Sequence, residues 1–95
     1  MTSRIPTSVS DIKPSSDALT AHLEGEAVLL HIGTKQYFRL NRTGAHIWKA
    51  LESGMAPDAI AASLVAAFEV SDDDAREAVR SLLAELVAGK LVTES

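Results

Sequence analysis

The feature that most constrains this fold is a change of hydrophobic period at Asn41. Residues 36–40, Gln-Tyr-Phe-Arg-Leu, are rich in aromatic residues and follow the period of two that is typical of a half-buried strand. From residue 44 onward the apolar positions instead recur at i, i+3, i+4 and i+7, the stripe of an amphipathic helix that faces a core. These positions are Gly44, Ile47, Trp48 and Leu51. Asn41 offers a side-chain oxygen to the first free N–H groups of that helix, so we predict a strand that runs directly into a helix at this residue.

Two more strands are predicted before this junction. Residues 18–23 carry a weak strand pattern, and Glu24-Gly25 supplies a tight turn because glycine adopts positive φ readily. Residues 26–32 form a stronger and nearly continuous apolar run, which predicts the central strand of the sheet, covered on more than one side. Gly33-Thr34-Lys35 then closes a second hairpin into residues 36–40. The result is a three-stranded antiparallel meander whose third strand has an open edge.

Three helices are predicted to follow the meander. The first spans about residues 42–52 and ends at Ser53-Gly54, since glycine commonly follows a helix C-terminus. Pro57 marks the start of the second helix, because the first helical turn tolerates a missing N–H group. The third and longest helix begins at Ser71, the start of a capping-box variant, and is stopped by Gly89.

The order of elements gives the fold class: α+β, with a three-stranded antiparallel meander followed by three α-helices in a winged helix-turn-helix-like order. Residues 91–93 are expected to be extended. Residues 1–16 hold two of the three prolines and few apolar residues, which predicts a flexible N-terminal arm ahead of a domain at residues 17–95. In the alternative interpretation, Ile5, Val9 and Ile12 dock this arm on the domain.

Composition argues against several classes of function. The chain has no cysteine, so it offers no disulfide, no thiolate metal site and no thiol nucleophile. Its net charge of -4 disfavours nucleic acid as the main partner, because phosphate binding depends on neutralisation by Lys and Arg. No apolar run approaches the roughly 20 residues of a membrane helix, and the first residues lack the apolar centre of a signal peptide. We therefore expect a cytoplasmic protein that binds neither nucleic acid nor membrane.

No group of side chains points to catalysis or to a cofactor. His22, His31 and His46 form no i, i+4 pair and have no carboxylate at ligand spacing, so they are expected to be ordinary histidines of strands or helix surfaces and not metal ligands. The glycines occur singly, without a nucleotide-binding motif. The three aspartates at residues 72–74 point in different directions at a helix start, and capping explains them better than a cation site does. We expect a protein that is not an enzyme and that uses neither metal nor cofactor.

A winged-helix DNA-binding transcriptional regulator is the alternative function that this order of elements allows. Its third helix would enter the major groove, and the first residues of that helix would meet the phosphates. Here those residues are Asp72, Asp73 and Asp74, which would repel the phosphates.

The strand-to-helix junction resembles that of a known family. The residues that carry the resemblance are Gly33-Thr34-Lys35-Gln36-Tyr37-Phe38-Arg39-Leu40-Asn41, Thr43-Gly44-Ala45, Ile47-Trp48, Leu51 and Gly54. They look like the PqqD-like family, whose members are also called RiPP recognition elements, the leader-peptide binding domains of ribosomally made, modified peptides. The resemblance covers about residues 17–94. Within the family, the pattern from Tyr37 to Trp48 favours the free-standing B1-type proteins of lasso-peptide clusters.

The resemblance implies three antiparallel strands, three helices and a chaperone function: the domain holds the leader of a precursor peptide while a leader peptidase, cyclase or radical enzyme acts on it. In this family the leader lies between the third strand and the third helix. The matching residues are Gln36, Tyr37, Phe38, Arg39 and Leu40 on the strand, with Arg76, Val79, Arg80 and Leu83 on the helix. The predicted open edge agrees, because a disordered peptide can add to it as a fourth strand. The same edge can pair with a second copy, so we expect a monomer or a weak dimer.

The strand residues of this set also have structural interpretations. Phe38 and Leu40 share one strand face and are expected to be core, whereas Tyr37 and Arg39 share the other face and are the better candidates for peptide contact. Trp48 lies on the core stripe of the first helix and is expected to be structural.

The helix residues divide in the same way. Val79 and Leu83 are core unless a cleft separates helix from strand, in which case they form an apolar pocket. Arg76 and Arg80, one turn apart, either meet acidic residues of a leader or lie on a solvated face.

Overall fold

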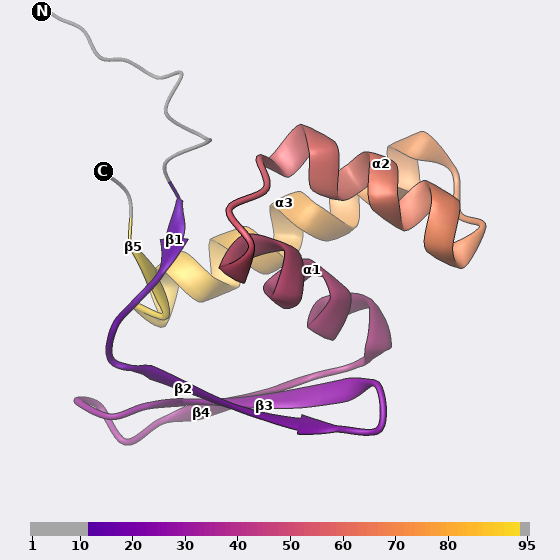
Figure 1. Cartoon of the computed structure of the whole chain (residues 1–95). Helices are drawn as coiled ribbons and strands as arrows, with labels where there is room; N and C mark the ends of the chain where they lie inside the picture. The colour runs from indigo at the N-terminus through magenta and orange to yellow at the C-terminus, as the bar shows by residue number, and fades with distance from the viewer. Residues whose placement is uncertain (1–11, 94–95) are drawn as a thin grey trace, which may run out of the picture.

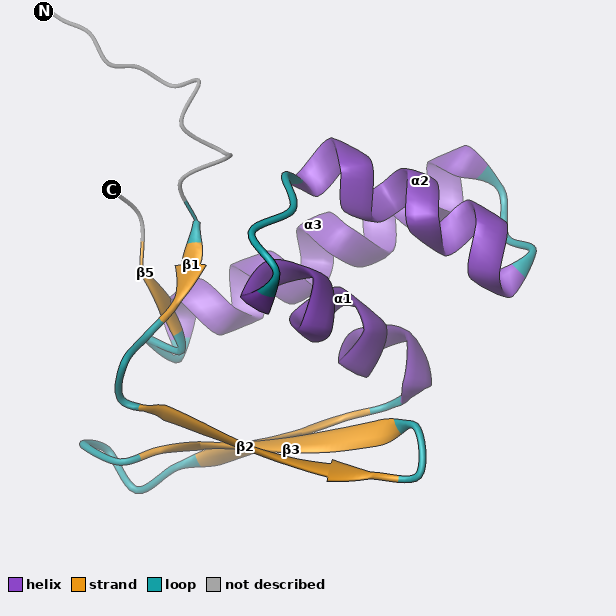
Figure 2. Cartoon of the chain, viewed as in Figure 1, coloured by secondary structure: helices purple, strands orange, loops and turns teal. Residues whose placement is uncertain are grey.

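The computed structural model describes residues 12–93, in which a three-stranded sheet and a short two-stranded ribbon accompany three helices (Figure 1). The strands are β1 (Lys13–Pro14), β2 (Ala18–Leu23), β3 (Glu26–His31), β4 (Tyr37–Leu40) and β5 (Val92–Thr93); the helices are α1 (Arg42–Glu52), α2 (Pro57–Phe68) and α3 (Asp72–Ala88). The sheet has the antiparallel order β2-β3-β4. All three helices lie on the same side of it (Figure 2). The predicted α+β class and the order of elements are confirmed.

The junction between β4 and α1 forms as its sequence predicts. Asn41 is the N-cap of α1, and its Oδ1 accepts a hydrogen bond of 2.9 Å from the N–H of Gly44. A Cβ atom at Gly44 would lie 3.3 Å from Cβ of Leu40, closer than such contacts usually are. Glycine therefore allows α1 to start directly against the end of β4.

The core lies between the sheet and the helices. Trp48 and Ile47 of α1 are buried against Leu29 of the central strand, and Trp48 Nε1 donates a hydrogen bond of 2.9 Å to Oγ1 of Thr20 on β2. This bond satisfies the buried indole N–H and fixes α1 across the sheet, which confirms the structural role expected of Trp48. On the far side of α1, α2 and α3 complete the core with residues such as Ile60, Leu64 and Leu86.

The prediction that the central strand is covered on more than one side is wrong. Burial alternates along β3: Ala27, Leu29 and His31 are buried, whereas Val28 and Leu30 on the opposite face are only half-buried. The reason is that the described part of the chain places helices on one face only, so the apolar run lies on a sheet that is covered on one side. The uncovered face continues onto the neighbouring strands.

The β3–β4 turn depends on a histidine. His31 is buried, and its Nδ1 accepts hydrogen bonds from the backbone N–H groups of Gly33 and Thr34, at 3.0 and 3.1 Å. Because Nδ1 accepts, the proton of the neutral ring is on Nε2. The positive φ of the turn, 65°, belongs to Lys35. His31 was expected to be an ordinary strand histidine, yet its side chain stabilises the turn that leads into β4.

The N-terminal and C-terminal segments meet in the ribbon. Lys13 pairs with Thr93 and Pro14 with Val92, so the extended residues expected near the C-terminus are present. Ile12 is half-buried against the core. Of the arm predicted at residues 1–16, residues 1–11 lie outside the described residues, together with Ile5 and Val9.

Candidate functional site

The open edge of β4 is the first component of the candidate site. β4 pairs with β3 on one side and with no strand of residues 12–93 on the other. The N–H of His31 donates to the carbonyl of Gln36, which makes these two residues a hydrogen-bonded pair of the antiparallel ladder. Such pairs alternate along a ladder, so Phe38 and Leu40 direct their backbone groups to β3. The N–H and C=O groups of Tyr37 and Arg39 therefore point to the open edge.

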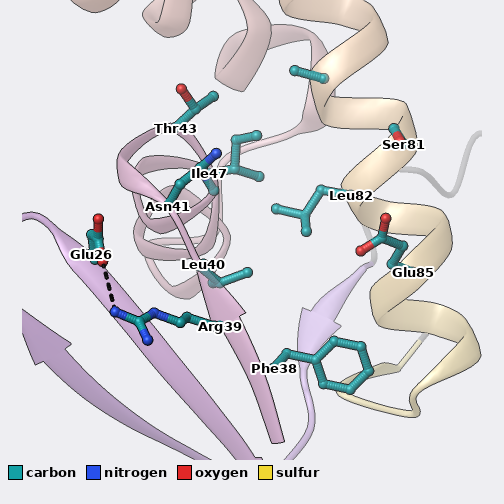
Figure 3. A pocket seen from close by; sticks show the side chains of 12 residues that line it. Glu26, Phe38, Arg39, Leu40, Asn41, Thr43, Ile47, Ser81, Leu82 and Glu85 are labelled. Atoms are coloured by element: carbon teal, nitrogen blue, oxygen red, sulfur yellow. Dashed lines mark hydrogen bonds and ion pairs between the residues drawn. The ribbon is translucent and has the colours of Figure 1, made fainter.

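Helix α3 faces this edge across a groove of about 560 Å³ (Figure 3). The sequence brings the two walls together because α3 packs over α1 and α2, and α1 starts directly at the end of β4. The lining residues are Glu26, Phe38, Arg39, Leu40, Asn41, Thr43, Gly44, Ile47, Ala78, Ser81, Leu82 and Glu85. The lining combines apolar side chains, such as Leu40, Ile47 and Leu82, with polar and charged ones.

Phe38 joins the strand wall of the groove to the end of α3. Its side chain extends from β4 toward α3 (Figure 3), where a Cβ atom on Gly89 would lie 2.6 Å from Cζ of the ring. Gly89 follows the last helical residue, as predicted, but its φ is -86°, and the residue in the left-handed region is Lys90. A side chain at residue 89 would have to displace the far end of this ring, so the glycine leaves room for Phe38 and is not needed for backbone freedom.

The strand residues fall where their period predicts. Phe38 is half-buried and Leu40 is buried, and both line the groove, whereas Tyr37 and Arg39 are exposed on the opposite face of the sheet. Tyr37 is 72% exposed. Arg39 also lines the mouth of the groove, and its Nη2 lies 3.7 Å from Oε1 of Glu26. Gln36 precedes β4 and contributes its carbonyl to the β3 ladder, not a side chain to the groove.

The four helix residues expected to face the strand lie elsewhere. Arg76, Val79, Arg80 and Leu83 line a separate apolar hollow of about 260 Å³ between α2 and α3. Val79 is buried there, so it belongs to the core on that side. The structure does not bring these four residues to β4. The wall that α3 presents to the strand is instead Ala78, Ser81, Leu82 and Glu85, a face that sequence reasoning missed.

Both arginines of α3 form ion pairs with carboxylates on the side of the helix that lies beside α2. Arg76 Nε lies 2.9 Å from Oδ2 of Asp72, and its Nη1 lies 3.2 Å from Oδ1 of Asp58 on α2. The hydrogen bond to Asp72, with the charges of both aspartates, raises the pKa of Arg76 above its usual value. Arg80 is paired with Glu77. Neither arginine is directed to the groove beside β4.

Neither a group of metal ligands nor a membrane-spanning helix is found among residues 12–93. In this range no three His, Asp or Glu side chains gather in a way that could hold a metal ion. No helix in the same range is long and apolar enough to cross a membrane.

Comparisons with known proteins identify the family. The family model described as coenzyme PQQ synthesis protein D (PqqD) matches residues 26–92. The chain belongs to the PqqD family. The matched residues include β3, β4, all three helices and hence both walls of the groove.

Two solved structures resemble this member of the PqqD family over most of its length. The first, TbiB1 in complex with the TbiA(beta) leader peptide, is 34% identical with a TM-score of 0.79, and the match covers 84% of this chain and 93% of that chain. The second, lasso peptide synthetase B1 complexed with the leader peptide, is 25% identical with a TM-score of 0.79, and the match covers 87% of this chain and 98% of that chain. A search of curated proteins found no match.

Proposed function

We propose that this chain binds the leader segment of a ribosomally synthesised precursor peptide and presents the peptide to separate enzymes. The observation that carries the proposal is the open edge of β4 facing α3 across a groove, in a PqqD-family chain whose structural neighbours were solved with leader peptides bound. The leader would lie in this groove as a fourth strand of the sheet.

The physical basis of binding is strand addition. The N–H and C=O groups of Tyr37 and Arg39 offer backbone hydrogen bonds to any extended peptide, and these bonds do not depend on the peptide's side chains. Selectivity then comes from the side chains that alternate into the groove, where Phe38, Leu40 and Leu82 form an apolar surface. The leader peptide therefore needs an apolar side chain that faces α3.

The proposed role requires no catalytic group in this chain. The chemistry would belong to a separate enzyme that acts on the held peptide: a leader peptidase, a cyclase or a radical enzyme. In this proposal the chain described here is a cytoplasmic protein and a monomer or weak dimer. The apolar outer face of the sheet, which includes the exposed residues Leu19, Leu23 and Tyr37, leaves room for contact with such a partner.

The test removes one edge donor without changing the fold. Arg39→Pro deletes the N–H group that points to the open edge, and proline is tolerated on an edge strand when its missing donor faces outward. The TbiA(beta) leader, which is bound in the structure of the 34% identical neighbour, is the probe and is titrated calorimetrically. We expect Arg39→Pro to weaken binding about tenfold or more, because one backbone hydrogen bond to the peptide is lost and the proline ring obstructs the edge where the peptide would pair.

Arg39→Ala is the matched control, because it removes the same side chain and keeps the N–H group. It should retain most of the affinity that Arg39→Pro loses, and thermal melts should show both variants folded. Equal affinities of Arg39→Pro and Arg39→Ala for the leader would exclude strand addition at β4.

A further inference from the structure

One carboxylate in the groove has no counter-charge. Glu85 lies on the groove-facing side of α3, and its side chain is directed toward Leu82 and Phe38 (Figure 3). Within residues 12–93, no Lys, Arg or His lies within ion-pair distance of it. Four other carboxylates, on β3, α2 and α3, are each paired with an arginine; these are Glu26, Asp58, Asp72 and Glu77.

The position of Glu85 is also unfavourable for the isolated helix. The last turn of α3 contains no basic residue, and the first one after it is Lys90, beyond the C-cap Gly89. The C-terminal end of a helix carries partial negative charge, here reduced because the carbonyls of Glu85, Leu86 and Val87 accept hydrogen bonds from the N–H groups of residues 89–91. A carboxylate near this end is repelled by the helix dipole, whereas a cation there is stabilised. Glu85 thus places an unpaired negative charge on the groove wall close to the C-terminal end of α3.

The neighbouring aromatic ring, that of Phe38, can also attract a cation. Phe38 lies beside Glu85 at this end, held against Gly89, whose N–H donates to the carbonyl of Glu85. The face of an aromatic ring attracts a cation through its quadrupole. A Lys or Arg side chain that reached Glu85 would therefore meet a carboxylate near a helix C-terminus, with the phenyl ring of Phe38 close by.

The spacing along α3 fits an added strand. Leu82 and Glu85 are three residues apart on the helix, a separation of about 5–6 Å between their Cβ atoms. Side chains on the same face of a strand are two residues apart, or about 6.6–6.8 Å. One strand can therefore place one side chain against Leu82 and the next groove-facing side chain against Glu85.

We propose that the peptide held in this groove carries a basic residue, Lys or Arg, that pairs with Glu85, two positions from an apolar residue that packs on Leu82. This proposal rests on the proposed function, since it assigns the charge of the ligand in that same groove. It differs from one of the two alternatives that the sequence left open, in which Arg76 and Arg80 meet acidic leader residues; the other placed both arginines on a solvated face.

The test uses randomised peptides, so the sequence of the leader is not required. A displayed library of randomised short peptides is selected against the full wild-type chain, and each enriched peptide is re-tested against Arg39→Pro to keep those that need the β4 edge. The same selection is repeated with Glu85→Gln and Glu85→Lys. Both changes are at an exposed position, and thermal melts confirm that the variants fold.

We expect edge-dependent peptides from the wild type to be enriched in Lys or Arg two positions from an apolar residue. The enrichment should disappear with Glu85→Gln and change to Asp or Glu with Glu85→Lys. In titrations, Glu85→Gln should weaken a selected basic peptide about two- to fivefold, the range of an exposed ion pair, and added salt should reduce this difference.

Two other outcomes separate the proposals. Edge-dependent peptides without basic enrichment would overturn the role of Glu85 and leave strand addition intact. A selection that yields no edge-dependent peptide would overturn the proposed function, and with it the assignment of charge.

Discussion

Gly89 and Phe38 show at the scale of single residues how the groove is shaped. The ring of Phe38 occupies the space where a side chain at residue 89 would begin, so a glycine on α3 and an aromatic residue on β4 are fitted to each other. Their separation in the sequence hides this pairing. A glycine after a helix is ordinarily explained by its ability to adopt a positive φ, yet the φ of -86° at Gly89 is one that any residue can adopt.

Gly89→Ala should therefore act through Phe38. The new Cβ atom would lie 2.6 Å from Cζ, so the ring must move. Because Phe38 is half-buried and lines the groove, its ring has room to shift, and we expect the free energy of unfolding to fall by about 1 kcal/mol, the low end of the usual cost of overpacking. Urea denaturation measures the change. In a Phe38→Leu background the contact is absent, and Gly89→Ala should cost much less. The same cost in both backgrounds would show that the ring is not the cause.

At the scale of elements, local patterns predicted most of the fold. The change of period at Asn41 predicts both β4 and α1, because the cap and the apolar stripe are local features. Ser71 likewise caps α3, accepting a hydrogen bond of 3.1 Å from the N–H of Asp74, as expected. The bounds of α1 and β2 agree with the predicted residues.

The errors arise where an element's surroundings decide its role. β3 is nearly all apolar, but no local feature tells whether one or both of its faces are covered. The face of α3 beside β4 depends on how the helix rotates about its axis against α2, which its apolar stripe does not specify. Leu82 and Leu83 are adjacent and equally apolar, yet one lines the groove and the other the hollow beside α2.

This pair gives a matched test of the groove. Both leucines are partly buried, so Leu82→Ala and Leu83→Ala should each cost about 0.5–3 kcal/mol of stability. Only Leu82 borders the proposed peptide, and Leu82→Ala should weaken leader binding about tenfold, as expected for one well-packed contact worth more than 1 kcal/mol. Calorimetric titration beside urea denaturation separates the two effects. Affinity lost only in Leu83→Ala would move the site to the hollow between α2 and α3.

At the scale of the whole molecule, the groove joins parts of the chain that are far apart in sequence. Its walls come from β4, the first half of α1 and residues 78–85 of α3, with Glu26 from β3, and Phe38 in one wall lies against Gly89 at the end of α3. Local patterns predict each wall but not their separation. The resemblance to a family predicts where the site lies. The charges that line the groove have to be read from the structure of this chain.

The distribution of charge over the molecule gives the last prediction. In the alternative DNA-binding function, the start of α3 would approach the phosphates, but Asp72, Asp73 and Asp74 lie there, and Arg76 is paired with Asp72 and Asp58. The net charge of -4 adds long-range repulsion.

We expect no shift of duplex DNA in gels at protein concentrations up to about micromolar at physiological salt, and no gain in affinity as salt is lowered. Replacing the three aspartates by asparagine should leave leader affinity unchanged, because they lie outside the groove. Sub-micromolar, salt-sensitive binding of duplex DNA by the wild type would instead favour the regulator and count against a peptide as the principal partner.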